Sequence, residues 1–152
     1  MRLSSQRLRL RDGHGGRLFF AAIFCALLGL VGVRADAVNY AGHYELADSK
    51  ADYSFSLDIT QTGSGFQLTF LAAMADGSGA APDGGGQGKV DANGALKFTF
   101  QDSFNNAGSG TLVSGKDGHH LTLDPTTVAD SRALRLYGDA LLKKTADKPA
   151  SP

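Results

Sequence analysis

The sequence predicts an all-β fold, most simply a single eight-stranded antiparallel meander barrel, with a two-sheet β-sandwich as the alternative. Apolar and polar residues alternate along several segments, such as Phe66–Met74, which is typical of strands with one buried face. Turn signals such as Asn93-Gly94 and Asp117-Gly118 separate these segments at short spacing and favour hairpins. No segment has convincing helical periodicity.

We expect strands near residues 40–48, 52–62, 65–74, 87–91, 94–102, 107–115, 118–125 and 133–144. A short helical turn near 130–133 is compatible with capping by Asp130 or Ser131. Short hairpins without a long crossover favour a barrel, because closure removes exposed strand edges. The polar strand faces argue against an outer-membrane barrel.

Residues 1–35 have the features of a secretory signal peptide: a basic start, an apolar run over 18–33 and small residues at its end. We expect cleavage after Ala35, or alternatively after Ala37, by the Sec route. An uncleaved anchor is the alternative, although a spanning helix needs roughly 20 apolar residues. The predicted organisation is therefore a signal peptide (1–35), a barrel domain (36–144) and a disordered tail (145–152), in a periplasmic or secreted protein.

Charge and cysteine content exclude several functions. The whole chain balances 15 basic against 15 acidic residues. From Asp36 onward, however, 9 Lys and Arg face 14 Asp and Glu. An acidic surface without a basic cluster argues against nucleic-acid binding, and no membrane association is expected after signal cleavage. The lone cysteine, Cys25, lies in the leader, so the exported domain has neither a disulfide nor a thiol nucleophile.

Catalytic and metal-binding patterns are missing from the sequence. There is no Gly-x-Ser-x-Gly elbow, and Glu45 is the single glutamate. Adjacent strand residues point to opposite faces, so His119 and His120 cannot readily share one ion. We therefore expect a non-enzymatic protein with no catalytic residues, no metal and no cofactor.

A glycine-rich segment, Asp76–Gly88, is the main candidate for binding. Six of its thirteen residues are glycine, which predicts an irregular loop. Loops on a rigid scaffold often carry binding residues. The candidate ligand or partner contacts are Asp76, Ser78, Asp83, Gln87 and, in a later turn, Phe104. The alternative interpretations are a plain connector, or a calcium site on the two aspartates that lacks EF-hand spacing.

Two short patches resemble a known group of barrels. Gly42-His43-Tyr44 opens the first expected strand, and Arg135 lies in the last. In these residues and in its strand count, the domain resembles the calycins, the group of barrels that includes lipocalins and avidins. As a whole, the chain resembles small exported bacterial proteins. The resemblance implies a structural, barrel-closing pair in which Arg135 packs across Tyr44. Biotin binding is not implied, because the chain has no tryptophan.

These observations predict an exported binding protein that contacts a protein partner through its loops, as inhibitors of cell-wall hydrolases do. One alternative is a carrier that holds a small apolar ligand in the barrel mouth. A hydrolase with an unrecognised site is the other.

Overall fold

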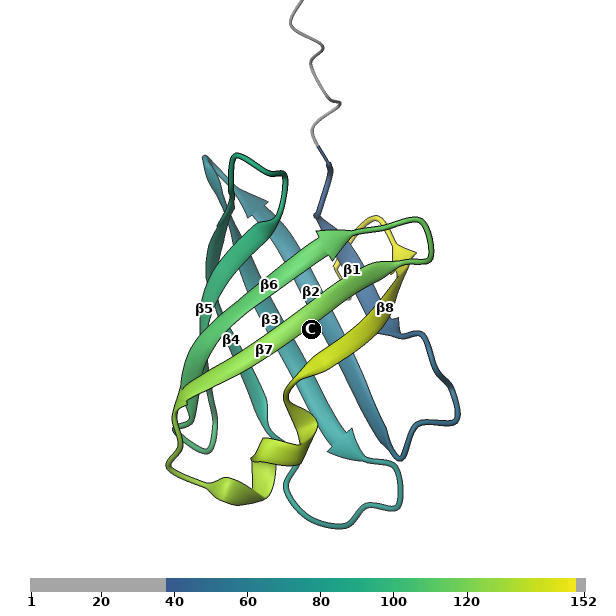
Figure 1. Ribbon diagram of the computed structural model, residues 1–152, viewed down its shortest axis with the longest axis vertical. Coiled ribbons are helices and arrows are strands. Elements are labelled where there is room, and N and C mark those ends of the chain that lie inside the picture. Colours follow the sequence, from purple (N-terminus) through teal and green to yellow (C-terminus); the bar gives the residue numbers. More distant parts are fainter. Residues whose placement is uncertain (1–37, 150–152) are drawn as a thin grey trace, which may run out of the picture. The chain divides into compact units, whose positions relative to one another are not determined.

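The structure, a computed structural model, describes residues 38–149 and contains one closed antiparallel barrel (Figure 1). The predicted leader, its two cleavage sites and the end of the predicted tail lie outside the described residues. The elements are β1 (Gly42–Leu46), β2 (Tyr53–Thr62), β3 (Gly65–Met74), β4 (Asp83–Val90), β5 (Leu96–Asp102), β6 (Ala107–Ser114), β7 (His119–Thr127), the 3-10 helix η1 (Ser131–Leu136) and β8 (Asp139–Ala146). Each strand pairs with the next, and β8 pairs with β1. The predicted meander barrel is therefore confirmed.

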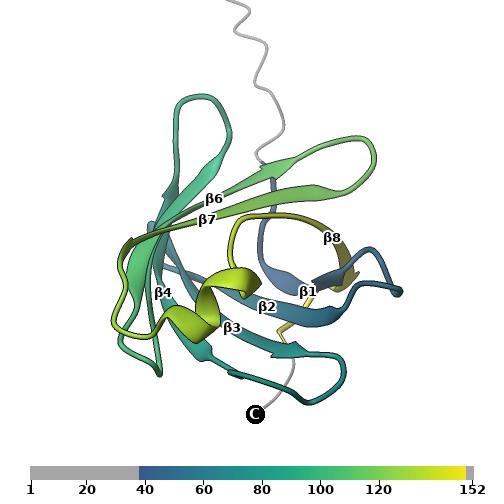
Figure 2. The same ribbon diagram turned by 60° about the horizontal axis from the view of Figure 1, so that its bottom comes forward.

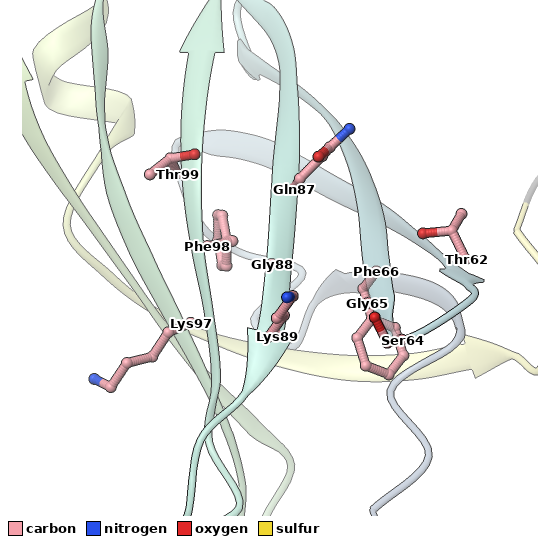
Figure 3. A pocket seen from close by; sticks show the side chains of 10 residues that line it. All are labelled: Thr62, Ser64, Gly65, Phe66, Gln87, Gly88, Lys89, Lys97, Phe98 and Thr99. Atoms are coloured by element: carbon pink, nitrogen blue, oxygen red, sulfur yellow. The ribbon is translucent and has the colours of Figure 1, made fainter.

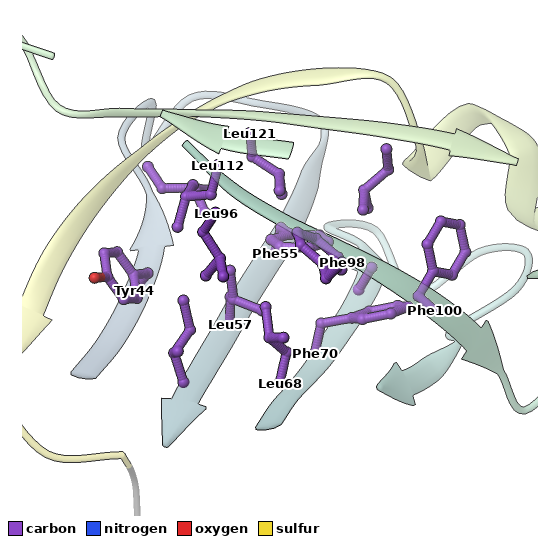
Figure 4. Close-up of a cluster of buried hydrophobic side chains, with 14 of the residues drawn as sticks. Tyr44, Phe55, Leu57, Leu68, Phe70, Leu96, Phe98, Phe100, Leu112 and Leu121 are labelled. Carbon is purple, nitrogen blue, oxygen red and sulfur yellow. The ribbon is translucent and has the colours of Figure 1, made fainter. Parts of the chain in front are cut away.

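Strand alternation sends the apolar residues into the barrel, where they form one continuous core (Figure 4). Its aromatic part runs through Phe70, which stacks on Phe55 with ring centroids 5.7 Å apart and meets Phe100 edge-on at 5.9 Å. Such ring pairs contribute about 0.5–1.5 kcal/mol each beyond the area that they bury. The core is thus filled by large side chains.

The glycine-rich segment is not a loop throughout, so the prediction for residues 76–88 is wrong from Asp83 onward. β4 begins there and pairs along its length with β3 and β5. Gly88 lies between Phe66 and Phe98, and Gly86 lies between Leu68 and Phe100. A Cβ on Gly86 would lie 1.7 Å from the Thr99 carbonyl oxygen and one on Gly88 would lie 2.6 Å from the Lys97 carbonyl oxygen, so these glycines let the backbone of β4 approach that of β5 closely.

On the other side of β5, a glycine of β6 makes room for a core side chain. A Cβ placed on Gly110 would lie 2.2 Å from Cζ of Phe98, its cross-strand partner. Real Cβ atoms do not approach so closely, so the Phe98 ring occupies the place of the missing side chain. Glycine at Gly110 of β6 is therefore a packing requirement of the Phe98 ring in β5.

The last strand begins later than predicted. Residues 131–136 form η1, whose start is capped by the Asp130 carboxylate accepting from the Arg132 backbone N–H at 2.9 Å. The capped turn expected near 130–133 is confirmed. β8 then runs to Ala146, which pairs with His43, so the first two residues of the predicted tail belong to the barrel.

Arg135 consequently lies in η1 and not in the last strand as expected. The cation nearest the Tyr44 ring is Lys144, with Nζ 6.0 Å from the ring centroid. Lys144 is also the β8 residue opposite Tyr44 where β1 and β8 close the barrel. The expectation that Arg135 packs across Tyr44 is therefore wrong. Lys144 lies across the Tyr44 ring instead.

In a meander, alternate connections lie at the same end of the barrel. The connections 47–52, 75–82, 103–106 and 128–138, three of which are the longest in the barrel, share one end, which we call the loop end (Figure 2). The other end has the short turns 63–64, 91–95 and 115–118. There the fully buried Tyr40 donates its hydroxyl to the Gly94 carbonyl at 2.6 Å and meets Phe66 and His119 edge-on.

Candidate functional site

A buried polar cluster fixes the loop end. Asp102 continues the inward positions of Leu96, Phe98 and Phe100 and is only 5% exposed. Its carboxylate accepts from the backbone N–H groups of Phe104 and Asn106 at 2.9 and 2.7 Å, and from the Asn106 side-chain amide at 2.9 Å. These bonds fold the β5–β6 turn around one carboxylate, as buried polar groups require.

Asn106 joins this turn to the β7–β8 connection. The side chain is fully buried, and its Oδ1 accepts from the backbone N–H groups of Ala129 and Asp130 at 2.8 and 2.9 Å. Tyr137, just after η1, donates its hydroxyl to Asp102. Burial and this contact with a carboxylate raise the pKa of Tyr137 above its ordinary value. Asp102 and Asn106 thus hold the β5–β6 turn and the β7–β8 connection in one fixed arrangement.

The two connections carry an aromatic–arginine pair on their outer side. The Arg132 guanidinium lies 5.6 Å from the centroid of the Phe104 ring, within cation–π range. Asp130 accepts from Arg132 through both carboxylate oxygens, the shorter contact being 2.5 Å. Hydrogen bonds from Arg132 lower the pKa of Asp130 to about 2, so the pair stays ionised at neutral pH.

Two exposed apolar residues lie in the same β7–β8 connection as Arg132. Leu134 of η1 is 36% exposed and Val128 is 47% exposed. We call Phe104, Val128, Arg132 and Leu134 the loop-end surface. Aromatic residues and arginine are enriched at the centres of protein interfaces.

The β3–β4 loop lies next to η1. Asp76 accepts from the Ser78 backbone N–H at 2.8 Å, and hydrogen bonds from the Ser78 side chain and backbone lower the pKa of Asp76. A Cβ on Gly79 would lie 2.8 Å from Nη2 of Arg135, which places the arginine directly against this loop. The loop and η1 therefore border each other at the same end of the barrel.

Four of the five predicted contact residues lie at the loop end. Asp76 and Ser78 are in the β3–β4 loop, and Phe104 is in the β5–β6 turn. Asp83, the first residue of β4, links the two connections, because its backbone N–H donates to Ser103 Oγ at 3.2 Å and its carbonyl accepts from the Ser103 N–H at 2.7 Å. Gln87 lies apart from them, in a hollow on the outer wall (Figure 3).

Sequence reasoning missed the residues that organise the site, namely Asp102, Asn106, Arg132 and Tyr137. One signal was present: the alternation that points Phe98 and Phe100 inward also points Asp102 inward. A polar residue at a core position predicts a buried hydrogen-bonding partner. The partner follows four residues later, beyond a turn in which Asn105 adopts a positive φ of 63°.

Two further features of the described residues bear on the candidate chemistries. Among residues 38–149, no group of three His, Cys, Asp or Glu side chains is arranged to hold a metal ion. Within this same range, no helix has the length and the apolar sequence that are needed to cross a membrane.

Fold and site together define a closed, filled β-barrel with a rigid polar network under one end. Comparisons of the chain with protein-family models, curated proteins and solved structures gave no match.

Proposed function

We propose that this chain is an exported, calycin-like and non-enzymatic binding protein that recognises a protein partner through its loop-end surface. The single observation that carries the proposal is the Arg132–Phe104 pair, held from beneath by Asp102 and Asn106. Ordering loops during binding costs free energy, so loops that are already fixed bind more tightly. The export signal, as interpreted from the sequence, would place this surface outside the cytoplasm.

The alternative of an apolar ligand carrier has less support. The core residues fill the barrel, Tyr40 covers one end and η1 lies across the other (Figure 2). An eight-stranded barrel is just wide enough for its own side chains or one small ligand. Here the aromatic side chains of the core occupy the barrel interior. The loops therefore offer the better surface for recognition.

The test is capture of the partner by matched variants. The purified protein is immobilised and exposed to the extracytoplasmic fraction of its native cells. We expect one captured protein whose affinity falls roughly tenfold or more for Phe104→Ala and Arg132→Ala, because interface aromatic and arginine anchors dominate binding energy.

Val113→Ala and Lys116→Ala are the controls, since both residues are exposed and lie near the opposite end. They should bind as the unaltered protein does. Equal capture by all four variants, with unchanged melting temperatures, would show that the loop-end surface is not the binding site.

A further inference from the structure

A short segment before β1, residues 38–41, covers the short-turn end of the barrel (Figure 1). We call this segment the strap. Its fully buried residue is Tyr40, whose hydroxyl donates to the Gly94 carbonyl in the β4–β5 turn at 2.6 Å. The Tyr44 hydroxyl of β1 donates to the Tyr40 carbonyl at 2.7 Å. These contacts tie the strap to both β1 and a turn on the far side of the barrel.

His119, the first residue of β7, lies against the strap. Strand alternation points its side chain inward, on the same face as Leu121 and Leu123. The imidazole ring meets Tyr44 and Tyr40 edge-on, with centroid distances of 4.9 and 6.4 Å. Its Nδ1 atom is buried without a hydrogen-bond partner, and no other buried side-chain polar atom in residues 38–149 is in that position.

The unpaired Nδ1 atom makes the site sensitive to the protonation of His119. A neutral imidazole has one ring nitrogen that accepts a hydrogen bond, whereas the imidazolium donates from both. Protonation at Nδ1 would therefore place a charged donor in a buried position without an acceptor. Burying a charged group in this way costs more free energy than leaving a neutral acceptor unpaired. The cost falls when the strap opens, because water then reaches Nδ1.

The charged surroundings also oppose a proton on His119. The titratable groups that face the imidazole are Tyr40 of the strap, Tyr44 of β1 and Lys144 of β8. Lys144 is paired with Asp147 at 3.1 Å, and no carboxylate in the described part of the chain forms an ion pair with His119. Burial, and to a smaller extent the Lys144 ammonium, lower the pKa of His119 below its ordinary value of 6.5.

We propose that His119 makes the strap acid-sensitive: the neutral imidazole packs against the closed strap, and its protonation releases Tyr40 and opens the short-turn end. The closed form is favoured above about pH 6.5 and loses this advantage as the pH falls, because the open form then binds the proton more tightly. This device lies at the opposite end of the barrel from the loop-end surface and does not depend on the proposed partner.

NMR titration of the His119 imidazole in the purified full chain tests the first step. We expect a midpoint clearly below 6.5 in the folded protein and a return to about 6.5 in the urea-unfolded chain. For each pH unit between these midpoints, the ratio of open to closed chains rises by up to about tenfold on acidification. A folded midpoint at or above 6.5 would overturn the proposal, since closure would then not disfavour the proton.

Hydrogen exchange tests whether the strap is the part that opens. Exchange of the segment 38–46 is measured by mass spectrometry at about pH 7.5 and pH 5, in the unaltered chain and in His119→Phe, which keeps an aromatic ring but cannot be protonated. Taking the ratio of the two exchange rates at each pH cancels the intrinsic effect of pH. We expect this ratio to be several-fold greater at the lower pH.

His120→Gln is the matched control, because His120 is the exposed neighbour on the outer face of β7. It should exchange as the unaltered chain does at both pH values. The proposal is overturned if the ratio for 38–46 is the same at both pH values. An equal acid response in the β5 segment, Leu96–Asp102, would show that the whole barrel loosens and would also overturn it.

Discussion

Asn106 and Asp102 are joined by three hydrogen bonds. The Asp102 carboxylate accepts from the Asn106 backbone N–H at 2.7 Å and from its side-chain amide at 2.9 Å, and the Asp102 backbone N–H donates to the Asn106 carbonyl at 2.9 Å. Asn106 Oδ1 simultaneously holds the backbone of Ala129 and Asp130. One amide side chain therefore sets the relative position of the β5–β6 turn and the β7–β8 connection, which together carry the loop-end surface.

Replacement of this residue by alanine should be strongly destabilising. Asn106→Ala leaves the partly buried backbone N–H groups of Ala129 and Asp130 without their acceptor and removes one of the two hydrogen bonds that Asp102 Oδ2 accepts. We expect a loss of about 2–3 kcal/mol in the free energy of unfolding, measured by urea denaturation. Asn93→Ala, at an exposed turn, should change it by less than about 0.5 kcal/mol. Similar losses for both variants would contradict the role assigned to Asn106.

The close packing of Gly110 against the Phe98 ring can be tested in the same assay. Gly110→Ala places a methyl group where the Phe98 ring lies and should cost about 1–3 kcal/mol by overpacking. In a Phe98→Leu background the ring is absent, so the same substitution should cost clearly less. A double-mutant cycle measures this coupling. Additive effects would mean that Gly110 and Phe98 do not compete for the same space.

Charge reversal at Lys97, which is the cross-strand partner of Lys89 on β4, should stabilise the barrel. Lys97→Glu replaces a like-charge cross-strand pair by an opposite-charge one, and we expect a gain of about 0.2–1 kcal/mol. The gain should shrink in high salt, because surface electrostatics are screened. Lys116→Glu, outside a strand pair, serves as the matched control. A destabilised Lys97→Glu variant would show that the two ammonium groups do not repel each other in the folded protein.

The tyrosine pKa values predict how stability responds to alkaline pH. Burial raises the pKa of Tyr137 and of Tyr44 in the folded chain above the ordinary value of 10.0. The unfolded chain therefore releases these protons first, so the stabilisation is complete below about pH 10 and is lost as the pH rises further. Each such tyrosine contributes a slope of about −1.4 kcal/mol per pH unit above that point.

Tyr137→Phe isolates this contribution, because it removes one titrating group and leaves the others in place. Urea denaturation at a series of pH values should show a shallower alkaline decline in the variant and no difference in slope near neutrality. An unchanged alkaline slope would mean that Tyr137 ionises equally well in the folded and unfolded chains.

Local patterns were sufficient to predict the barrel. The alternation through Phe66–Met74 and the Asn-Gly and Asp-Gly turns depend on neighbouring residues alone. A strand was expected at 87–91, but the start of β4 at Asp83 could not be predicted in this way, because Gly84–Gly86 form a strand only through their pairing with β3 and β5. The start of β8 was missed for a related reason: η1 follows from the Asp130 cap and from burial of Ala133 and Leu136 against the barrel end.

The residues proposed for binding were chosen from the sequence, but the hydrogen-bond network beneath them could not be. Asp76, Ser78 and Phe104 lie in connections and Asp83 begins β4, and the meander topology brings these positions to one end. The link from Asn106 to Ala129 and Asp130 spans more than twenty positions in sequence. A contact of that range follows from the closed fold and from no local pattern.

The central claim is that the loop-end surface contacts a protein partner, and site-specific photo-crosslinking tests it most directly. A photoreactive phenylalanine analogue is placed at Phe104 in one variant and at Val113, near the opposite end, in another, and each is irradiated in its native cells. We predict one discrete crosslinked protein from position 104 that is absent from position 113 and is lost when Arg132→Ala is added. Crosslinking that is equal at both positions, or absent at position 104 in a correctly folded variant, would contradict the claim.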